Sequence, residues 1–219
     1  MFTGIIEEIG TVVDVQKTGD LQRTTVKAPQ IVADTEIGDS ISISGACQTV
    51  VDLNADRFVF ESVRETLTRT TLKDLRRGDR VNVERSMQLE GRFGGHLVMG
   101  HVDGVGTIVR RIDRREGALF AISLTDQLIR YVASQGSIAV DGISLTVVSA
   151  STDHFEVSII PYTLSHTTLS SKRAGERVNI EVDILARYIE RIADGQVRNP
   201  KWNVSQRGIT AEWLKEMGF

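Results

Sequence analysis

The chain has 219 residues, of which 41% are hydrophobic, and its 26 Lys and Arg nearly balance its 29 Asp and Glu. A length above about 150 residues can bury a core for one large domain or two small ones, which excludes a disordered chain. The net charge of −3 provides no basic field for a nucleic acid. A single cysteine excludes an intrachain disulfide. We therefore expect a cytoplasmic protein without a nucleic-acid partner.

The amino-terminal segment carries Glu7 and Glu8 where a secretory signal would need a basic and then an apolar run. No stretch approaches the ~20 uncharged apolar residues of a membrane span. We expect an unprocessed chain with no membrane partner.

The sequence contains an internal repeat, which consists of four pairs of similar blocks that occur in the same order. Three pairs are 97 residues apart, and the pair nearest the start of each half is 96 apart. The blocks are residues 45–51 and 142–148, 66–72 and 163–169, 76–84 and 173–181, and 9–13 and 105–109. A repeat of this kind dictates the architecture. We predict an amino-terminal domain at 1–97, a homologous domain at 98–190, and a linker with a carboxy-terminal helix at 191–219.

Each half alternates apolar and polar residues over short runs, as in residues 39–44 and 178–183, and glycines separate the runs. This pattern predicts half-buried strands. A closed barrel leaves no exposed strand edge, so we predict an all-β fold with short helices: two tandem, homologous, six-stranded Greek-key-like β-barrels and a carboxy-terminal helix.

Helical patterns are few. Residues 64–75 and 125–133 predict short crossover helices, the second capped by Thr125 or Asp126. After a polar linker, residues 210–219 place Trp213, Leu214 and Met217 on one helical face. An apolar face beyond both barrels favours self-association over packing on the chain's own barrel.

The usual metal, nucleotide and dinucleotide motifs are absent from the sequence. His96 and His101 are five residues apart, a spacing that does not favour a metal site. His101 is open to two interpretations from the sequence, a hydrogen-bonded loop residue or an acid or base. We predict no metal and no cofactor.

The repeat pairs Cys47 with Ser144 and Thr49 with Thr146, which is the pattern of two related ligand pockets. The same alignment sets His101 against Gly4, so the pockets are chemically unequal. Two unequal pockets for one ligand suit a disproportionation of identical molecules.

Several segments together resemble the riboflavin synthase family: MFTGIIE at the start, GACQTVVDL, the junction GRFGGHLVMGHVDGVGTI, GSIAVDGISLTVV, IIPYTLSHTTL and VNIEVD. The resemblance covers residues 1–190. It implies two tandem barrels and a homotrimer assembled by a carboxy-terminal helix, with the first barrel of one subunit facing the second barrel of another. Association with lumazine synthase is left open.

The resemblance implies a transferase of riboflavin biosynthesis. Two molecules of 6,7-dimethyl-8-ribityllumazine exchange a four-carbon unit and give riboflavin and 5-amino-6-ribitylamino-uracil. The substrate is its own electron sink, so the protein mainly orients two heterocycles and moves protons.

The family's pattern implies site residues of two kinds. The chemically important ones are Ser40, Cys47, His101, Ser144, Thr146 and Asp183. His101 is predicted to assist methyl deprotonation, Ser144 and Thr146 to hold the pteridine or steer a proton, and Cys47 with Ser40 to position or activate the other substrate. Asp183 would orient such a group. The first pocket would add Phe2, Gly4, Ile5, Ile6, Gln48, Thr49, Glu61, Ser62, Val63, Arg64, Glu65 and Thr66. The second, which would also hold His101, would add Gly100, Val102, Gln135, Leu145, Ile160, Pro161, Tyr162, Thr163, Leu164 and Ser165.

Four residues depart from the family's pattern: Ser44, Gln48, Gln135 and Tyr162. Gln135 stands where a lysine is common, which places affinity in more doubt than reaction type. Two other function classes remain. A lumazine-binding antenna protein would bind without turnover. A flavin-binding reductase would need a nicotinamide domain, for which the two repeats leave no room.

Overall fold

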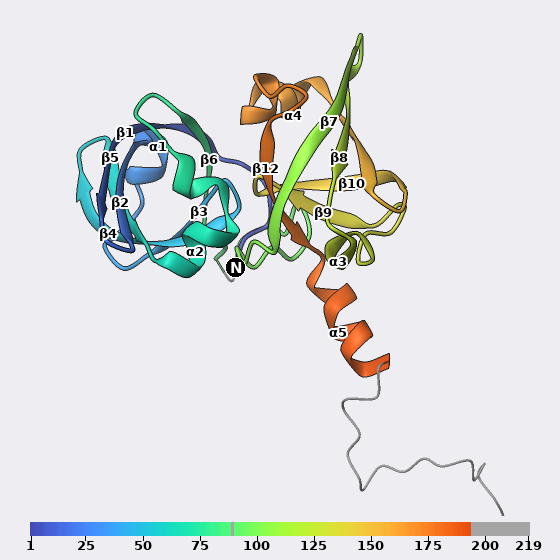
Figure 1. Ribbon diagram of the computed structural model, residues 1–219. Helices are drawn as coiled ribbons and strands as arrows, with labels where there is room; N and C mark the ends of the chain where they lie inside the picture. The colour runs from blue at the N-terminus through green and yellow to red at the C-terminus, as the bar shows by residue number, and fades with distance from the viewer. Residues whose placement is uncertain (89, 194–219) are drawn as a thin grey trace, which may run out of the picture. The chain divides into compact units, whose positions relative to one another are not determined.

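The computed structural model describes residues 1–88 and 90–193, and it contains two β-barrels (Figure 1). The first barrel consists of β1 (Glu8–Thr18), β2 (Leu21–Lys27), β3 (Ser40–Ile43), β4 (Ala46–Asn54), β5 (Arg57–Ser62) and β6 (Arg80–Arg85). The second consists of β7 (Gly104–Arg114), β8 (Gly117–Ser123), β9 (Ser137–Val140), β10 (Ile143–Ala150), β11 (His154–Ile159) and β12 (Arg177–Val182).

Both barrels close with the same strand order. The first runs β1-β2-β5-β4-β3-β6, and the second runs β7-β8-β11-β10-β9-β12. Every pairing is antiparallel, and the last strand of each barrel pairs with its first. The predicted fold class is therefore confirmed: two homologous six-stranded barrels with few, short helices.

Alternation along the strands produces two separate cores. Phe58 and Phe60 are fully buried in the first barrel, and Phe120 and Phe155 are fully buried in the second. Side chains of successive strand residues point to opposite faces, so the intervening residues face outward. Each core supports an outer face on which functional side chains are held rigidly.

The remaining elements are short. They are α1 (Pro29–Val32), α2 (Arg64–Arg69), η1 (Thr71–Asp74), α3 (Asp126–Ile129), α4 (Pro161–Ser165), η2 (Thr168–Ser170) and α5 (Ile184–Ala193). The predicted helix over 64–75 is wrong as a single helix, because the backbone of Thr70 is extended and its hydroxyl caps η1 by accepting from the Leu72 amide. The predicted side-chain cap of the helix at 125 is also wrong, since Thr125 precedes α3 without a capping hydrogen bond.

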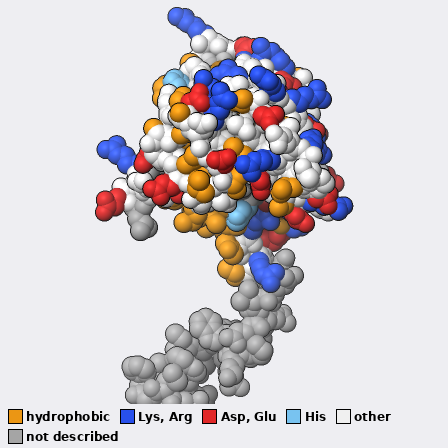
Figure 2. Space-filling model, turned by 90° about the vertical axis from the view of Figure 1, so that its left-hand side faces the viewer, with side chains coloured by type: hydrophobic (Ala, Val, Ile, Leu, Met, Phe, Trp, Pro, Cys, Tyr) orange, Lys and Arg blue, Asp and Glu red, His pale blue; other side chains and the backbone are white. Residues whose placement is uncertain are grey.

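The chain divides into two compact units, Met1–Ile184 and Leu185–Phe219. The predicted helix over 210–219, with Trp213, Leu214 and Met217, lies outside the described residues. Among the described helices, none is long and apolar enough to span a membrane. Acidic and basic side chains are intermixed on the face that Figure 2 presents, in keeping with the nearly balanced charge.

Candidate functional site

The two barrels meet at equivalent glycines. A Cβ added to Gly45 would lie 2.8 Å from the backbone nitrogen of Gly142, and a Cβ added to Gly142 would lie 2.7 Å from that of Gly45. Both have a positive φ, +88° and +79°. Only glycine permits this backbone contact between barrels in this conformation.

Two buried asparagines cross the same interface. The side-chain amide of Asn82 donates to the backbone carbonyl of Asp141 at 2.9 Å. The side-chain amide of Asn179 donates to the backbone carbonyl of Ser44 at 2.8 Å. Because unpaired buried amides are costly, these reciprocal bonds fix one relative placement of the barrels. The interface thus has approximate twofold symmetry.

The segment that leads into each barrel contacts the other barrel. We call residues 2–6 and 98–102 the leading segments. The amide of Ser144 donates to the carbonyl of Gly4 at 2.8 Å, and the amide of Cys47 donates to the carbonyl of Gly100 at 2.9 Å. The leading segments also pair with each other through Phe2 and Val98. Each barrel's polar strand is therefore completed by the leading segment of the other barrel.

This exchange corrects two parts of the sequence analysis. Gly4 is equivalent to Gly100, since they have φ of +76° and +78° and make equivalent bonds, so His101 corresponds to Ile5 and not to Gly4. The extra residue of the second repeat lies after this point.

The assignment of leading segments to pockets was also wrong. Ile6 packs against the core of the second barrel, and Val102 is buried in that of the first. We therefore define the first pocket as the outer face at Cys47 with the second leading segment, and the second pocket as the face at Ser144 with the first.

The first pocket, as defined, includes Cys47 and Thr49 on β4 and His101, which follows the Gly100 that bonds to Cys47. Cys47 is half-buried, and Thr49 and His101 are exposed. Phe2, predicted to line the site, is fully buried in a small cluster that includes Cys47. It supports the pocket from beneath.

Gln48 and Ser62 point into the first barrel, away from the face that carries Cys47. The Ser62 hydroxyl donates to Oε1 of Gln48 at 2.7 Å, and both side chains are buried. The repeat places the apolar Leu145 and Ile159 at the equivalent positions of the second barrel. The unusual Gln48 is thus one partner of a buried polar pair.

Gln48→Leu alone should lower the free energy of unfolding by about 1–3 kcal/mol, because it leaves the Ser62 hydroxyl buried without its partner. The double variant Gln48→Leu with Ser62→Ile imports the apolar pair of the second barrel and should recover most of that loss. Urea unfolding of both variants measures the difference. Equal losses in both would show that the loss does not come from the unpaired Ser62 hydroxyl.

In the second pocket, Ser144 has a partner that the sequence analysis missed. Nδ1 of His96 lies 2.7 Å from Oγ of Ser144, and the His96 side chain is only 9% exposed. Its Nε2 is buried with no hydrogen-bond partner. Burial lowers the pKa of His96, against the opposite effect of the Asp183 carboxylate. His96 is therefore a neutral imidazole at neutral pH.

A glycine makes this contact accessible. A Cβ on Gly95 would lie 2.0 Å from the carbonyl oxygen of Thr3 and 2.9 Å from Cβ of Ser144. No sequence pattern links the two residues of this pair, because His96 and Ser144 are 48 residues apart.

The rest of the second pocket is an open surface. Thr146 is exposed, whereas Leu145 packs against the core of the second barrel. On α4, the exposed ring of Tyr162 stacks on His166 with centroids 4.0 Å apart. Gln135 has a φ of +66° in the turn before β9, where the first barrel has Gly38 with +100°.

Other predicted residues lie around these two faces. Glu61 forms an ion pair with Arg23 at 2.7 Å, and Arg64 lies 3.6 Å from Asp20. Val63 is exposed just before α2. Three further sets follow in the same regions: Glu65 and Thr66 on α2, Ile160 before α4, and Pro161, Thr163, Leu164 and Ser165 on α4.

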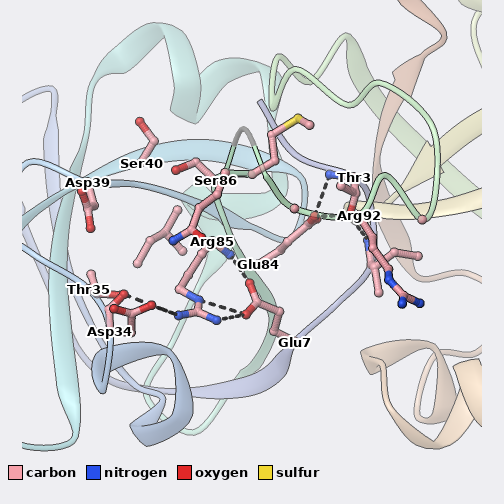
Figure 3. A pocket seen from close by; sticks show the side chains of 16 residues that line it. Thr3, Glu7, Asp34, Thr35, Asp39, Ser40, Glu84, Arg85, Ser86 and Arg92 are labelled. Atoms are coloured by element: carbon pink, nitrogen blue, oxygen red, sulfur yellow. Dashed lines mark hydrogen bonds and ion pairs between the residues drawn. The ribbon is translucent and has the colours of Figure 1, made fainter.

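Ser40 opens onto a cavity of about 620 Å³ beside the first barrel (Figure 3). Ile5 is the other predicted residue in its lining. Arg85 reaches across the cavity to Glu7 at 2.6 Å and to Asp34 at 2.9 Å, and Figure 3 shows these contacts. Cys47 and Thr49 are not in the lining of this cavity. Ser40 is nevertheless the strand partner of Thr49.

Asp183 follows the end of β12, where its carboxylate acts on His96. No group of three or more His, Cys, Asp or Glu side chains within residues 1–88 and 90–193 could hold a metal ion.

Comparison with known proteins identifies the two barrels. The lumazine binding domain matches residues 3–86 and again residues 99–183. A riboflavin synthase of Actinobacillus pleuropneumoniae is 41% identical over 220 residues, covering 100% of both chains. One of Bacillus subtilis is 40% identical over 219 residues, again covering 100% of both. One of Mycobacterium bovis is 47% identical over 196 residues, which cover 88% of this chain and 98% of the relative.

Solved structures match the double barrel. LumP complexed with riboflavin superimposes with a TM-score of 0.77 at 27% identity, covering 83% of this chain and 99% of LumP. LumP complexed with 6,7-dimethyl-8-(1'-D-ribityl) lumazine superimposes with a TM-score of 0.76 at 24% identity, with the same coverage. At 24% identity, the match to LumP with the lumazine shows a common fold only.

Proposed function

The chain belongs to the riboflavin synthase family, and we propose that it performs the family's reaction between two lumazines. One lumazine is held at the first pocket and the other at the second pocket. The reaction is a dismutation without a cofactor. Two molecules of 6,7-dimethyl-8-ribityllumazine exchange a four-carbon unit, and the products are riboflavin and 5-amino-6-ribitylamino-uracil.

The exchange of the leading segments is the observation that carries this proposal. It produces two pockets with the same backbone geometry and different reactive groups, Cys47 with His101 in one and Ser144 with His96 in the other. Two identical molecules placed there meet different surroundings. One can lose a proton while the other accepts a nucleophile, which is what a dismutation requires.

We propose roles for the side chains that are compatible with their placement. His101, exposed on the second leading segment, takes the proton from the methyl group of one lumazine. Cys47, supported by Ser40 through the neighbouring strand, positions or activates the lumazine in the first pocket. Ser144 and Thr146 hold the pteridine in the second pocket, and Asp183 acts on that pocket through His96. Holding both rings in reactive geometry supplies most of the rate.

We further propose that the chain works as a homotrimer, in which the first pocket of one protomer faces the second pocket of another. Support comes from the open faces at Thr49 and Thr146 and from α5, where Leu185, Tyr188 and Ile192 repeat at helical spacing and are each at least 60% exposed. Sedimentation should show a trimer that Ile192→Asp dissociates, with loss of activity. A fully active monomer would contradict the proposal. Cytoplasmic location is proposed from the single cysteine.

A binding protein without turnover is the second candidate, because the LumP structures share the double barrel. Against it stand the riboflavin synthases that align over the full length of this chain at 40% and 41% identity.

The purified chain, mixed with 6,7-dimethyl-8-ribityllumazine and nothing else, should consume two lumazines for each riboflavin formed and release the uracil in an equal amount. Absorbance and chromatography follow all three compounds. Tight binding of the lumazine without product would support the second candidate and contradict the first.

A further inference from the structure

Two buried glutamates hold the leading segments. Glu84 and Glu181 are the last residues of the repeated blocks 76–84 and 173–181. Both are buried near the ends of the last strands of their barrels, β6 and β12. The proposed reaction uses neither. Their carboxylates accept hydrogen bonds from backbone amides.

Glu84 accepts from the first leading segment. The amides of Thr3 and Gly4 donate to its carboxylate at 2.7 and 3.0 Å. The Thr3 hydroxyl donates at 2.8 Å, and Figure 3 shows Thr3 beside Glu84. Glu181 accepts from the second leading segment, with the amides of Met99 and Gly100 at 2.6 and 3.0 Å. Successive amides that converge on one anion form a nest, and the positive φ of Gly4 and of Gly100 is part of this backbone arrangement. We call each glutamate, together with the amides that it binds, a clamp.

Each clamped segment then crosses to the opposite barrel. Glu181 belongs to the second barrel, but the segment that it holds places Gly100 against Cys47 and carries His101 into the first pocket. A Cβ on Gly100 would lie 2.6 Å from Cβ of Cys47, so the segment lies directly against this residue.

From this connectivity we infer that Glu181 is a positioning residue for the first pocket and Glu84 for the second, each acting on the pocket of the barrel to which it does not belong. The inference rests on the proposed function for its catalytic consequence, but the clamp itself can be tested without any turnover.

The two clamps differ in charge. In the first barrel, Arg85 follows Glu84 and its guanidinium binds Glu7. In the second barrel, Val182 and Asp103 stand at the positions of Arg85 and Glu7, and the amide of Val182 donates to Asp103 at 2.8 Å. The position of Arg85 is thus occupied by an apolar residue, Val182, in the second barrel.

Burial is the main reason that the pKa of Glu181 is raised. Burial raises the pKa of Glu181 to about 7, the Met99 amide lowers it, and the Asp103 charge raises it further. The amides of Gly100 and His101 also lower this pKa. The neighbouring strand contributes the apolar Ala139 opposite Glu181. The clamp on the second leading segment should therefore close as the pH rises through about 7.

Cys47 provides a direct reporter, because it is the chain's single cysteine. At pH 8, Glu181→Gln should react with dithionitrobenzoate about tenfold faster than the unaltered chain, since charge-assisted bonds to the covering segment are lost. Glu84→Gln is the matched control, and it should leave the labelling rate within about twofold, because Gly4, whose amide Glu84 binds, lies against Ser144 and not against Cys47.

At pH 6 the ratio of the labelling rates of Glu181→Gln and the unaltered chain should approach one. Glu181 of the unaltered chain is then mostly protonated and, like the glutamine, carries no charge. Comparing the two proteins at the same pH isolates the effect of the clamp. Asp103→Asn removes the neighbouring charge and should keep Cys47 protected to a lower pH. In turnover, the acidic limb near pH 7 should be absent from Glu181→Gln.

Equal labelling of Glu181→Gln and Glu84→Gln at pH 8 would overturn the inference, as would a ratio that does not change with pH. An unaltered chain that forms no riboflavin would defeat the proposed function and leave the labelling result standing.

Discussion

Gly100→Ala should form riboflavin about 100-fold more slowly than the unaltered chain. The residue has a φ of +78°, a conformation that costs an alanine about 1 kcal/mol. Its new Cβ would also lie 2.6 Å from Cβ of Cys47 and 2.8 Å from Cε2 of the buried Phe2. Neither neighbour can withdraw, so the second leading segment must shift, and a displacement of about 1 Å at a reacting centre costs roughly 100-fold in rate.

Gly78→Ala is the matched control. Gly78 has a φ of +94°, but nothing lies within 4 Å of its added Cβ. It should lose about 1 kcal/mol of stability with unchanged turnover. Steady-state rates and urea unfolding measure both variants. Normal turnover by Gly100→Ala would show that the leading segment does not determine the geometry of the first pocket.

The free energy of unfolding should fall by about 3 kcal/mol between pH 4.5 and pH 7 through Glu181 alone. Burial raises the pKa of this carboxyl from 4.5 to about 7. Within that range the folded chain therefore holds a proton that the unfolded chain has released. Stability is lost as the pH rises and is constant above the folded pKa. Charging Glu181 thus costs global stability while it closes a local clamp.

Urea unfolding at pH 5 and pH 8 tests this sign. The unaltered chain should lose about 3 kcal/mol more than Glu181→Gln over that interval. Glu84 and Asp141, whose pKa values burial also raises, add losses common to both proteins. Parallel losses in the two proteins would contradict the assigned titration.

The fold could be predicted because its information is local and repeated. Alternating residues determine strands, and two copies of the same blocks determine two barrels of the same kind. The break at Thr70 was not predictable from helical spacing, because a single extended residue interrupts an otherwise helical run.

The site could be predicted only in part, because its key contacts join residues that are far apart in the sequence. The equivalence of Cys47 and Ser144 followed from the repeat, and their amides make equivalent bonds. The crossing of the leading segments left no pattern in composition or periodicity. His96 likewise could not be predicted as a site residue, because its contact is with Ser144, which belongs to the other repeat.

An equal mixture of unlabelled lumazine and lumazine labelled in every carbon tests most directly whether the two pockets make their ligands react with each other. Mass spectrometry of the riboflavin formed should find about half of the molecules with mixed label, divided equally between two masses, since each flavin takes its four-carbon unit from a second lumazine. Riboflavin that is only fully labelled or only unlabelled would contradict the account.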